Sequence, residues 1–250
     1  MSIQALIFDV DGTLAETEEL HRTSFNTAFA QAGLAWNWDR RLYGELLEVT
    51  GGKERIAHFI KILGASRALD QQTIADLHRA KTSIYANAVL GGALNLRPGI
   101  RRLLNEARQN GIAVAIATTT SRESVNALLH ASFGPAGLEQ FTFIAAGDSV
   151  AKKKPAPDIY HLVLKRLGLA GRDTIAIEDT PNGLRSANAA GIDAVITRSV
   201  FGGESGFDGA LTVVDHLGDP GNRCRVLQGR DIQKGMVTIA GLVRIRETSR

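Results

Sequence analysis

The chain has 250 residues, 44% of them hydrophobic and 22% charged, with a net charge of +3, which is ordinary for a soluble globular protein. No apolar run approaches the roughly 20 residues that a membrane-spanning helix needs, and the first residues lack the pattern of a secretory signal. We therefore expect a cytoplasmic protein with no membrane partner. The single cysteine, Cys224, excludes an internal disulfide and a cysteine-based zinc site.

The main body alternates between short apolar segments and helical patterns. The first segment, residues 3–8, is rich in strand-forming residues and is followed at once by polar and Gly residues, which is typical of a buried central strand. This alternation predicts an α/β fold with a doubly wound, Rossmann-like parallel sheet. Further strands are expected at 112–117, 141–145, 174–177 and 194–197, and helices at 99–110, 121–132, 157–167 and 181–190.

Residues 16–92, between the first and second predicted strands, contain no convincing strand pattern. An insert after the carboxyl end of a strand is expected to lie over the sheet edge where α/β proteins bind ligands. We therefore interpret 16–92 as a helical cap and residues 1–15 with 93–217 as the catalytic core. Spacings of three and four between apolar residues predict four cap helices, at 17–32, 39–49, 53–63 and 71–89.

The remaining residues, 218–250, form a basic tail in which the α/β alternation is lost. Residues 221–250 contain seven Lys and Arg and two acidic residues, a net +5, whereas residues 1–220 contain 22 basic and 24 acidic residues, a net −2. Because the body has no large cationic field, we expect no nucleic-acid partner. The tail is expected to be disordered or to add a strand at 237–246.

Two aspartates follow the first predicted strand. Asp9 and Asp11 lie two residues apart at its carboxyl end, and Gly12 permits a sharp turn after them. Two nearby carboxyl groups suit covalent catalysis, because their surroundings can separate their pKa values so that one attacks while the other handles the proton. The alternative is that both acids cap the next turn, and the pattern Asp-x-Asp-Gly-Thr alone does not decide.

Later predicted strands are also followed by polar residues. In an open parallel sheet the carboxyl ends of the strands converge on one crevice, so these side chains are expected to meet Asp9 and Asp11. Carboxylate oxygens are the ligands that Mg²⁺ takes together with substrate phosphate, which makes the combination typical of magnesium-dependent phosphate chemistry. The residues are a hydroxyl, an ammonium and two carboxylates, those of Thr118, Lys154, Glu178 and Asp179.

In this order, and each after a strand, the motifs resemble those of the haloacid dehalogenase-type phosphotransferases, over roughly residues 1–215. The resemblance implies an enzyme that hydrolyses phosphoric monoesters. It implies that Asp9 is the nucleophile that forms an aspartyl-phosphate, and that Asp11 acts as general acid and then as general base. It also implies that Thr118 and Lys154 hold the transferring phosphoryl group, a role in which positioning and charge neutralisation matter most.

The same resemblance implies Mg²⁺ as the cofactor. Its ligands would be Asp9, the backbone carbonyl of Asp11 and Asp179, with Glu178 orienting a bound water or Lys154. Members of this kind carry a helical cap inserted after the first motif, which matches the predicted insert.

Several residues are candidates for contact with the rest of the substrate. Glu18 and His21 lie near the first catalytic loop, and a Gly-rich, basic run lies between two predicted cap helices. Glycines permit close approach to an anion and the next helix offers free N–H groups, so a second phosphate has a place to dock. The alternative is an ordinary interhelical loop with solvated basic residues. The run consists of Thr50, Gly51, Gly52, Lys53, Glu54 and Arg55.

A strand-to-helix turn on the core side offers further hydroxyls and backbone donors, with a simple N-cap as the alternative. It consists of Thr118, Thr119, Thr120 and Ser121. With the run 50–55 and the segments 96–99 and 154–160, this turn looks like the CbbY branch. That branch implies hydrolysis of xylulose 1,5-bisphosphate, a misfire product that inhibits Rubisco of the Calvin cycle. Glu18 and His21 would contact the sugar, and the second phosphoryl would lie near Lys53 and Arg55.

Other functions stay open at this point. A β-phosphoglucomutase-like mutase would use the same Asp9 and Asp11 but pass the phosphoryl group to a second sugar hydroxyl. Phosphoglycolate is another possible substrate, although its small size leaves the basic run without an anion. A binding protein that keeps the fold without turnover is disfavoured because the whole charged set is present. We expect a monomer whose partner is a small phosphosugar.

The histidines and the aromatic cluster are interpreted structurally. Trp36, Trp38 and Tyr43 are expected to form part of the cap core, because an aromatic cluster between helices is more often core than ligand cage. Five histidines lack a partnered ligand spacing, so we expect no histidine metal site and assign them surface or partly packed positions. They are His58, His78, His130, His161 and His216.

Overall fold

Seven strands form one sheet in the computed structural model, which describes residues 3–64 and 69–247. Residues 1–2, 65–68 and 248–250 belong to the predicted core, cap and tail and lie outside the described residues. The strand order is β3-β2-β1-β4-β5-β6-β7, and all neighbours are parallel except β6 and β7. The strands are β1 (Ala5–Phe8), β2 (Ala113–Ala117), β3 (Phe143–Ala145), β4 (Thr174–Glu178), β5 (Asp193–Thr197), β6 (Thr212–Val214) and β7 (Val226–Gly229). The predicted doubly wound parallel sheet is confirmed.

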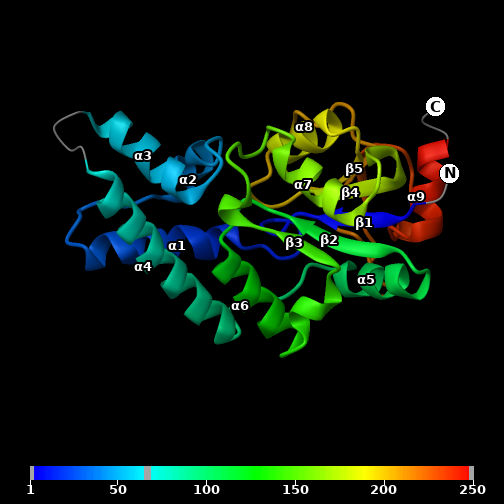
Figure 1. Ribbon diagram of the computed structural model, residues 1–250, viewed down its shortest axis with the longest axis horizontal. Helices are drawn as coiled ribbons and strands as arrows, with labels where there is room; N and C mark the ends of the chain where they lie inside the picture. Colours follow the sequence, from blue (N-terminus) through cyan, green and yellow to red (C-terminus); the bar gives the residue numbers. More distant parts are fainter. Residues whose placement is uncertain (1–2, 65–68, 248–250) are drawn as a thin grey trace.

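Helices cover both faces of this sheet (Figure 1). One face carries α5 (Ile100–Gln109) and α6 (Arg122–Phe133), and the other carries α7 (Asp158–Leu167) and α8 (Pro181–Ala189). Short 3-10 helices lie at Gly137–Gln140, Gly147–Ser149, Gly171–Asp173 and Gln233–Gly235. Within residues 3–64 and 69–247, no helix has the length and apolarity needed to cross a membrane.

The central strand shows why the sheet is buried on both sides. Successive side chains of a strand point to opposite faces. Leu6 and Phe8 therefore pack in the core beneath α5 and α6, whereas Ile7 packs in the core beneath α7 and α8. All three side chains are fully buried, which explains why the segment is uniformly apolar rather than alternating.

The order of the strands places the crevice. Connections leave β1 toward β2 on one side and return to β4 on the other, so the sheet changes winding direction between β1 and β4. Ligands of open α/β sheets bind outside the carboxyl ends of the strands at such a point. Asp9 directly follows β1 and Asp179 directly follows β4, so both carboxylates lie at the crevice.

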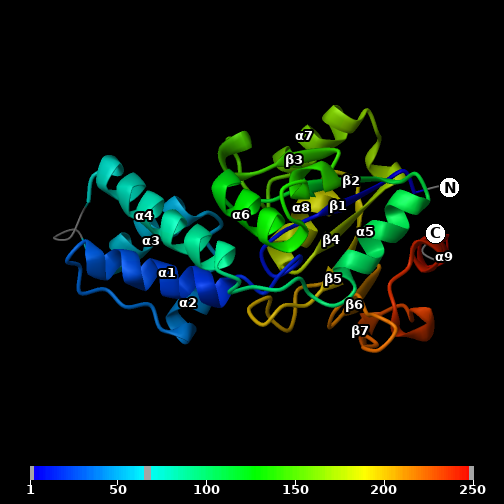
Figure 2. The same cartoon turned by 90° about the horizontal axis from the view of Figure 1, so that it is seen from below.

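The insert between β1 and β2 forms a separate helical lobe beside the core, which we call the cap (Figure 2). Its helices are α1 (Glu18–Gln31), α2 (Arg40–Leu46), α3 (Gly52–Leu63) and α4 (Gln71–Leu90). Asp39 and Asp70 cap α2 and α4 by accepting hydrogen bonds from the N–H groups of Leu42 and Thr73. The cap has its own core, in which the predicted aromatic cluster packs with Phe25, Phe29 and Phe59.

The tail is ordered over its described residues, and the predicted strand at 237–246 is wrong. Strand β7 pairs antiparallel with β6, and α9 (Ile239–Glu247) follows it. Ile239, Leu242 and Ile245 recur every three residues and bury one face of α9 in the core that also contains α5. This spacing is helical, but nine residues are too few for the sequence pattern to separate helix from strand. Strand β6 was not expected, because three residues give no recognisable period.

One ion pair fixes the end of the tail to the core. Arg246 is 3% exposed, and its Nε donates to Asp193 Oδ2 at 2.8 Å. Its Nη2 donates to the backbone carbonyls of Arg172 and Thr174. Arg246 is buried although Asp193 is about two-fifths exposed, and replacing Arg246 removes all three of these hydrogen bonds together with the packing of its side chain.

We predict that Arg246→Ala lowers the free energy of unfolding by about 2 kcal/mol and the melting temperature by about 4–8 °C. Arg223→Ala, which removes an exposed arginine of the same tail, is the control and leaves the melting temperature unchanged. Thermal unfolding followed by circular dichroism measures both. Equal melting temperatures for the two variants would contradict the docking of α9.

Candidate active site

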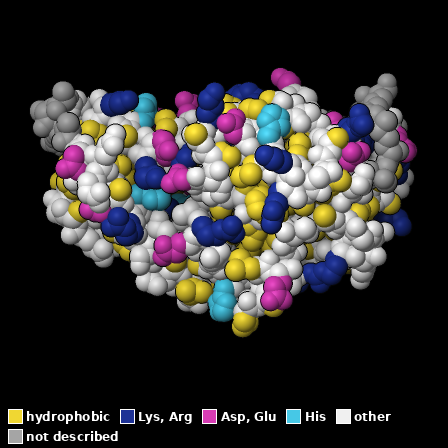
Figure 3. All heavy atoms as spheres, viewed as in Figure 1, with side chains coloured by type: hydrophobic (Ala, Val, Ile, Leu, Met, Phe, Trp, Pro, Cys, Tyr) yellow, Lys and Arg dark blue, Asp and Glu magenta, His cyan; other side chains and the backbone are white. Residues whose placement is uncertain are grey.

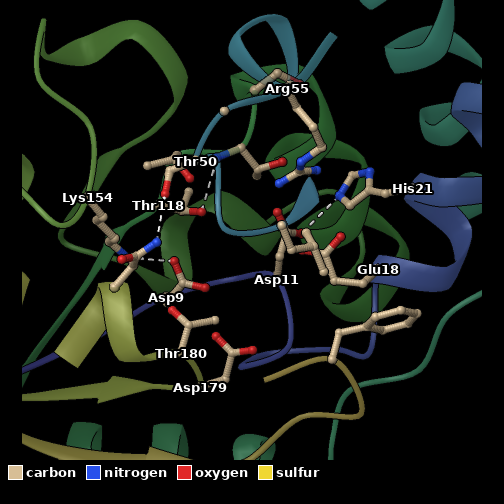
Figure 4. A pocket seen from close by; sticks show the side chains of 18 of the residues that line it. Asp9, Asp11, Glu18, His21, Thr50, Arg55, Thr118, Lys154, Asp179 and Thr180 are labelled. Atoms are coloured by element: carbon tan, nitrogen blue, oxygen red, sulfur yellow. Dashed lines mark hydrogen bonds and ion pairs between the residues drawn. The ribbon is translucent and has the colours of Figure 1, made fainter. Parts of the chain in front are cut away.

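A pocket lies between the carboxyl ends of the strands and the cap, and side chains from both line it (Figure 4). The surface view shows basic, acidic and histidine side chains gathered over the junction of the cap with the core (Figure 3). Every residue that the sequence predicted for catalysis, metal binding or substrate binding lines this pocket except Lys53. The predicted residues in its lining are Asp9, Asp11, Glu18, His21, Thr50, Gly51, Gly52, Arg55, Thr118, Thr119, Thr120, Ser121, Lys154, Glu178 and Asp179.

Asp9 is held against Lys154 at the end of β1. The Lys154 ammonium donates to Asp9 Oδ1 at 2.7 Å, to Glu178 Oε1 at 2.5 Å and to the carbonyl of Ala117 at 2.8 Å. Burial disfavours the ammonium, but the charges of Asp9 and Glu178 outweigh burial and raise the pKa of Lys154. Lys154 is therefore a permanent cation beside the carboxylate of Asp9.

Glu178 contacts that lysine from the end of β4. Its Oε1 accepts from both Lys154 and the hydroxyl of Tyr160, which donates at 2.6 Å. Burial, followed by the charge of Glu178, raises the pKa of Tyr160, so this hydroxyl keeps its proton. Of the two predicted roles for Glu178, orientation of Lys154 is the one that its contacts favour.

Asp179 lies close to the first catalytic loop. Its Oδ2 accepts from the Ser199 hydroxyl at 2.6 Å, and a β-carbon added to Gly12 would approach the same oxygen to 2.0 Å. Gly12 also has φ +76°, so only glycine allows the loop to pass so near the carboxylate. The predicted turn at Gly12 thus brings Asp179 beside the Asp9 loop.

Three buried carboxylates, those of Asp9, Glu178 and Asp179, have oxygens within 4.8 Å of one another. Burial raises the pKa of Asp9 to about 7, and burial together with Asp9 raises that of Asp179 well above its ordinary value. These shifts reflect negative charge that Lys154 alone does not neutralise. Crowded hard oxygen donors with excess negative charge fit a divalent cation such as Mg²⁺.

Asp11 faces the cap and depends on residues that sequence reasoning only partly found. Its Oδ1 accepts from the Thr17 hydroxyl at 2.7 Å and lies 3.1 Å from His21 Nε2. The Lys81 ammonium lies 2.6 Å from His21 Nδ1. Burial would raise the pKa of Asp11, but His21 and Thr17 lower it overall. In the ligand-free pocket Asp11 is ionised.

The turn from β2 to α6 presents donors toward Asp9. The hydroxyl of Thr118 accepts from the N–H of Thr120 at 3.3 Å, and Ser121 caps α6 by accepting from the N–H of Ser124. Ser121 is therefore an N-cap, which was the alternative interpretation of this turn. Thr118 is 1% exposed and lies in the pocket wall beside Asp9 and Lys154 (Figure 4).

On the cap side of the pocket, a series of hydrogen bonds connects Glu18, Tyr43 and Arg55. The hydroxyl of Tyr43 donates to Glu18 Oε2 at 2.6 Å and accepts from Arg55 Nη1 at 3.1 Å. Arg55 Nε also donates to the carbonyl of Leu46. Tyr43 packs in the cap core as expected, and its hydroxyl additionally fixes Glu18 and Arg55 relative to each other.

Lys53 does not line the pocket, contrary to the predicted substrate contact. Its ammonium is bound to Asp148 Oδ2 of the core at 2.6 Å. Lys153 Nζ lies 3.1 Å from both Asp148 Oδ1 and Glu54 Oε1. These four alternating charges join the cap to the core at the rim of the pocket. The ammonium of Lys53 is therefore paired with Asp148 and does not face the pocket.

Two further contacts bring the cap onto the core. The rings of Tyr43 and Phe201 meet edge to face with centroids 5.8 Å apart. Asn182 Nδ2 donates to the Thr50 hydroxyl and the Glu48 carbonyl, each at 3.4 Å. The cap therefore lies closed over the pocket.

Arg97, on the segment that returns from the cap, ties the closed arrangement to the sheet. Its Nη atoms donate to the carbonyls of Gly12, Thr197, Arg198 and Asp215, and its Nε pairs with Glu16 at 3.1 Å. Since Gly12 lies beside Asp179, this arginine holds Glu16, the segment that returns from the cap and the first catalytic loop together.

Sequence reasoning missed seven residues of the lining. Helix period alone does not reveal which face of a cap helix meets the core, although a polar residue within an otherwise buried face is a signal. Lys81 gives this signal, because it is 5% exposed on a helix whose buried face includes Leu77 and Tyr85. The seven are Phe25, Leu47, His78, Lys81, Thr180, Asn182 and Phe201.

Comparison with known proteins places the chain in a family. The model of the haloacid dehalogenase-like hydrolases matches residues 3–191. The plasmid CbbY protein of Cupriavidus necator is 50% identical over 221 residues, which span 87% of this chain and 87% of that protein. These matches cover the core motifs and the insert alike.

Solved structures agree with this placement. CbbY from Rhodobacter sphaeroides in complex with phosphate is 48% identical, with a TM-score of 0.81 over 86% of this chain and 94% of that one. A mutant of it in complex with xylulose 1,5-bisphosphate has the same identity, coverage and TM-score. A β-phosphoglucomutase from Clostridium difficile, 22% identical, has a TM-score of 0.71 over 86% of this chain and 91% of that one. The chain therefore belongs to the haloacid dehalogenase-like hydrolase family, in its CbbY branch, and is a phosphatase of that type.

Proposed function

We propose that the protein is a magnesium-dependent phosphatase that hydrolyses a sugar bisphosphate, xylulose 1,5-bisphosphate, to xylulose 5-phosphate through an aspartyl-phosphate. The relative from Rhodobacter sphaeroides, crystallised with xylulose 1,5-bisphosphate, supports this choice of substrate. In cells with Rubisco, this reaction removes an inhibitory product and so sustains the Calvin cycle.

The charge distribution in the pocket is the observation that carries the proposal. At the sheet end, Lys154 stands beside Asp9, while Arg55 and Lys81 line the opposite wall in the cap. Arg55 reaches in from the cap side in Figure 4, across the pocket from Asp9. A substrate with two phosphoryl groups meets cations at both ends, and charge-assisted hydrogen bonds to phosphate are among the stronger polar contacts.

The chemistry requires two displacements at phosphorus. In the first, an Asp9 carboxylate oxygen bonds to phosphorus, the bond from phosphorus to the sugar oxygen breaks, and Asp11 donates a proton to that oxygen. In the second, water attacks phosphorus, Asp11 takes its proton, and Asp9 leaves with release of phosphate. Lys154 and the donors at Thr118 balance the charge of the phosphoryl oxygens throughout.

The protonation states of Asp9 and Asp11 depend on the charges of the bound cation and substrate. In the ligand-free pocket the pKa of Asp9 is raised and that of Asp11 is lowered, the reverse of what a nucleophile and a general acid need. A divalent cation held by Asp9 and Asp179 supplies positive charge that favours their ionised forms. An arriving phosphoryl dianion favours a proton on Asp11. Substrate and cofactor together would therefore set the two roles.

We predict Mg²⁺-dependent release of phosphate from xylulose 1,5-bisphosphate, and a loss of about a thousandfold or more in Asp9→Asn. Ribulose 1,5-bisphosphate, β-glucose 1-phosphate and phosphoglycolate complete the panel, with phosphate measured against time. Conversion of β-glucose 1-phosphate to its 6-phosphate without free phosphate would identify a mutase instead. Preference for phosphoglycolate would contradict the bisphosphate, and no release from any substrate would contradict turnover itself.

The ion pair between Lys53 of the cap and Asp148 of the core gives a second test. It helps to hold the cap closed, and a closed cap excludes water from the first displacement. If Lys53 acts through Asp148, Lys53→Ala and Asp148→Ala each raise KM about threefold, since partly exposed ion pairs contribute little. The double variant is then no worse than either single variant. If Lys53 instead contacted the second phosphoryl group, its effect would be independent of Asp148. Steady-state kinetics of the four proteins with the bisphosphate distinguish the two cases.

A further inference from the structure

His78 is a pocket residue without a role in the chemistry above. It lies on α4, one turn before Lys81, and both side chains line the pocket. Helix α4 runs along the cap beside α1 (Figure 2), which carries Glu18 and His21. His78 is partly buried, which agrees with the surface or partly packed position expected from the sequence, and it contributes to the cap side of the pocket.

The ring of His78 is available for a ligand. Six polar side chains of the cap line the pocket, and five of them are engaged: Glu18, His21, Thr50, Arg55 and Lys81 each have a hydrogen-bond partner. Among the described residues, His78 has no side-chain hydrogen bond. A polar group enclosed in a pocket and left without a protein partner is suited to bind the substrate.

The field at this ring attracts anions. Burial, followed by the charges of Lys81, Lys53 and Lys153, lowers the pKa of His78 to about 3, against the smaller opposing effect of Asp148. The imidazole is therefore neutral and keeps one N–H donor. Lys53 and Lys153 are paired with Asp148 and Glu54 at the rim, so Lys81, whose charge acts most strongly on the ring, is the ammonium group that favours a negative ligand at the same place.

The ring also sets the shape of the wall. A β-carbon on Gly52 would lie 2.6 Å from both Cδ2 and Nε2 of His78, so the imidazole occupies the space that a side chain at position 52 would need. Gly52 is the first residue of α3, and its neighbour Gly51 has φ +100°. The imidazole and the start of α3 thus form one continuous surface.

From this geometry we infer that His78 is a specificity-determining residue, which donates a hydrogen bond to the phosphoryl group of the substrate that is not transferred. The inference rests on the proposed bisphosphate substrate and adds the group that recognises its distal end. His78 takes no part in bond making, because the reacting atoms lie at Asp9, which directly follows β1 of the core, whereas His78 lies on α4 of the cap.

The test compares two substrates that differ only at the distal end, xylulose 1,5-bisphosphate and xylulose 1-phosphate. We expect His78→Ala to lower kcat/KM for the bisphosphate about tenfold, mainly through KM, and to leave the monophosphate within about twofold. His78→Gln, which keeps a neutral donor, recovers part of the loss. Arg79→Ala, on the exposed side of the same helix, is the matched control and changes neither substrate.

Equal losses on both substrates, or no loss on either, would overturn the assignment. Binding separates this failure from failure of the proposed function. Calorimetry with the bisphosphate and Asp9→Asn measures affinity without turnover, and Asp9→Asn/His78→Ala is expected to bind about tenfold more weakly. If wild type releases no phosphate from the bisphosphate while this difference persists, the proposed function fails and the role of His78 stands. Equal affinities would remove the role of His78 even if wild type is active.

Discussion

The ammonium of Lys154 between Asp9 and Glu178 is the interaction on which the site depends. One cation is enclosed with three buried carboxylates, and burying unbalanced charge is costly unless each group is paired or a further cation is present. The sheet brings these groups together because their strands end at the same edge. The fold therefore keeps a surplus of negative charge at this place, which a divalent cation would balance.

The second requirement is communication between the cap and Asp11. Asp11 lies on a core loop, but Thr17, His21 and, through His21, Lys81 hold it from the cap. Closing the cap thus completes the surroundings of Asp11 as well as the pocket wall. Arg97 lies on the segment that returns from the cap, and its contacts with Gly12 and Glu16 connect this segment to the first catalytic loop.

The sequence was most informative where local pattern and position in the fold coincide. Asp9, Thr118 and Asp179 each follow an apolar strand, so the topology of a parallel sheet was enough to bring them together. Lys53 illustrates the limit. A basic residue at a helix start looks like an anion ligand, yet Asp148, 95 positions away, takes its ammonium, and no local pattern reports that distant partner.

Residues on the cap helices were hard to predict for a related reason. His78 and Lys81 reach the pocket because of how α4 docks on the core, which periodicity within α4 does not determine. The tail posed a different problem, because the nine residues of α9 are too few for their helical spacing to be recognised in the sequence. In both cases tertiary contacts decide what short-range preference leaves open.

The separate core of the cap has a consequence for how this enzyme can change. Phe29, Trp38 and Phe59 stabilise the cap without touching the sheet, so the residues that face the substrate are carried on a lobe with its own packing. Exchanges at Thr50 or Arg55 can alter which phosphate ester is accepted while Asp9 and Lys154 remain as they are. Exchanges at His21 or Lys81 would instead disturb Asp11, because these residues hold it from the cap. Selectivity and reactivity are thus separable at the first two positions and joined at the others.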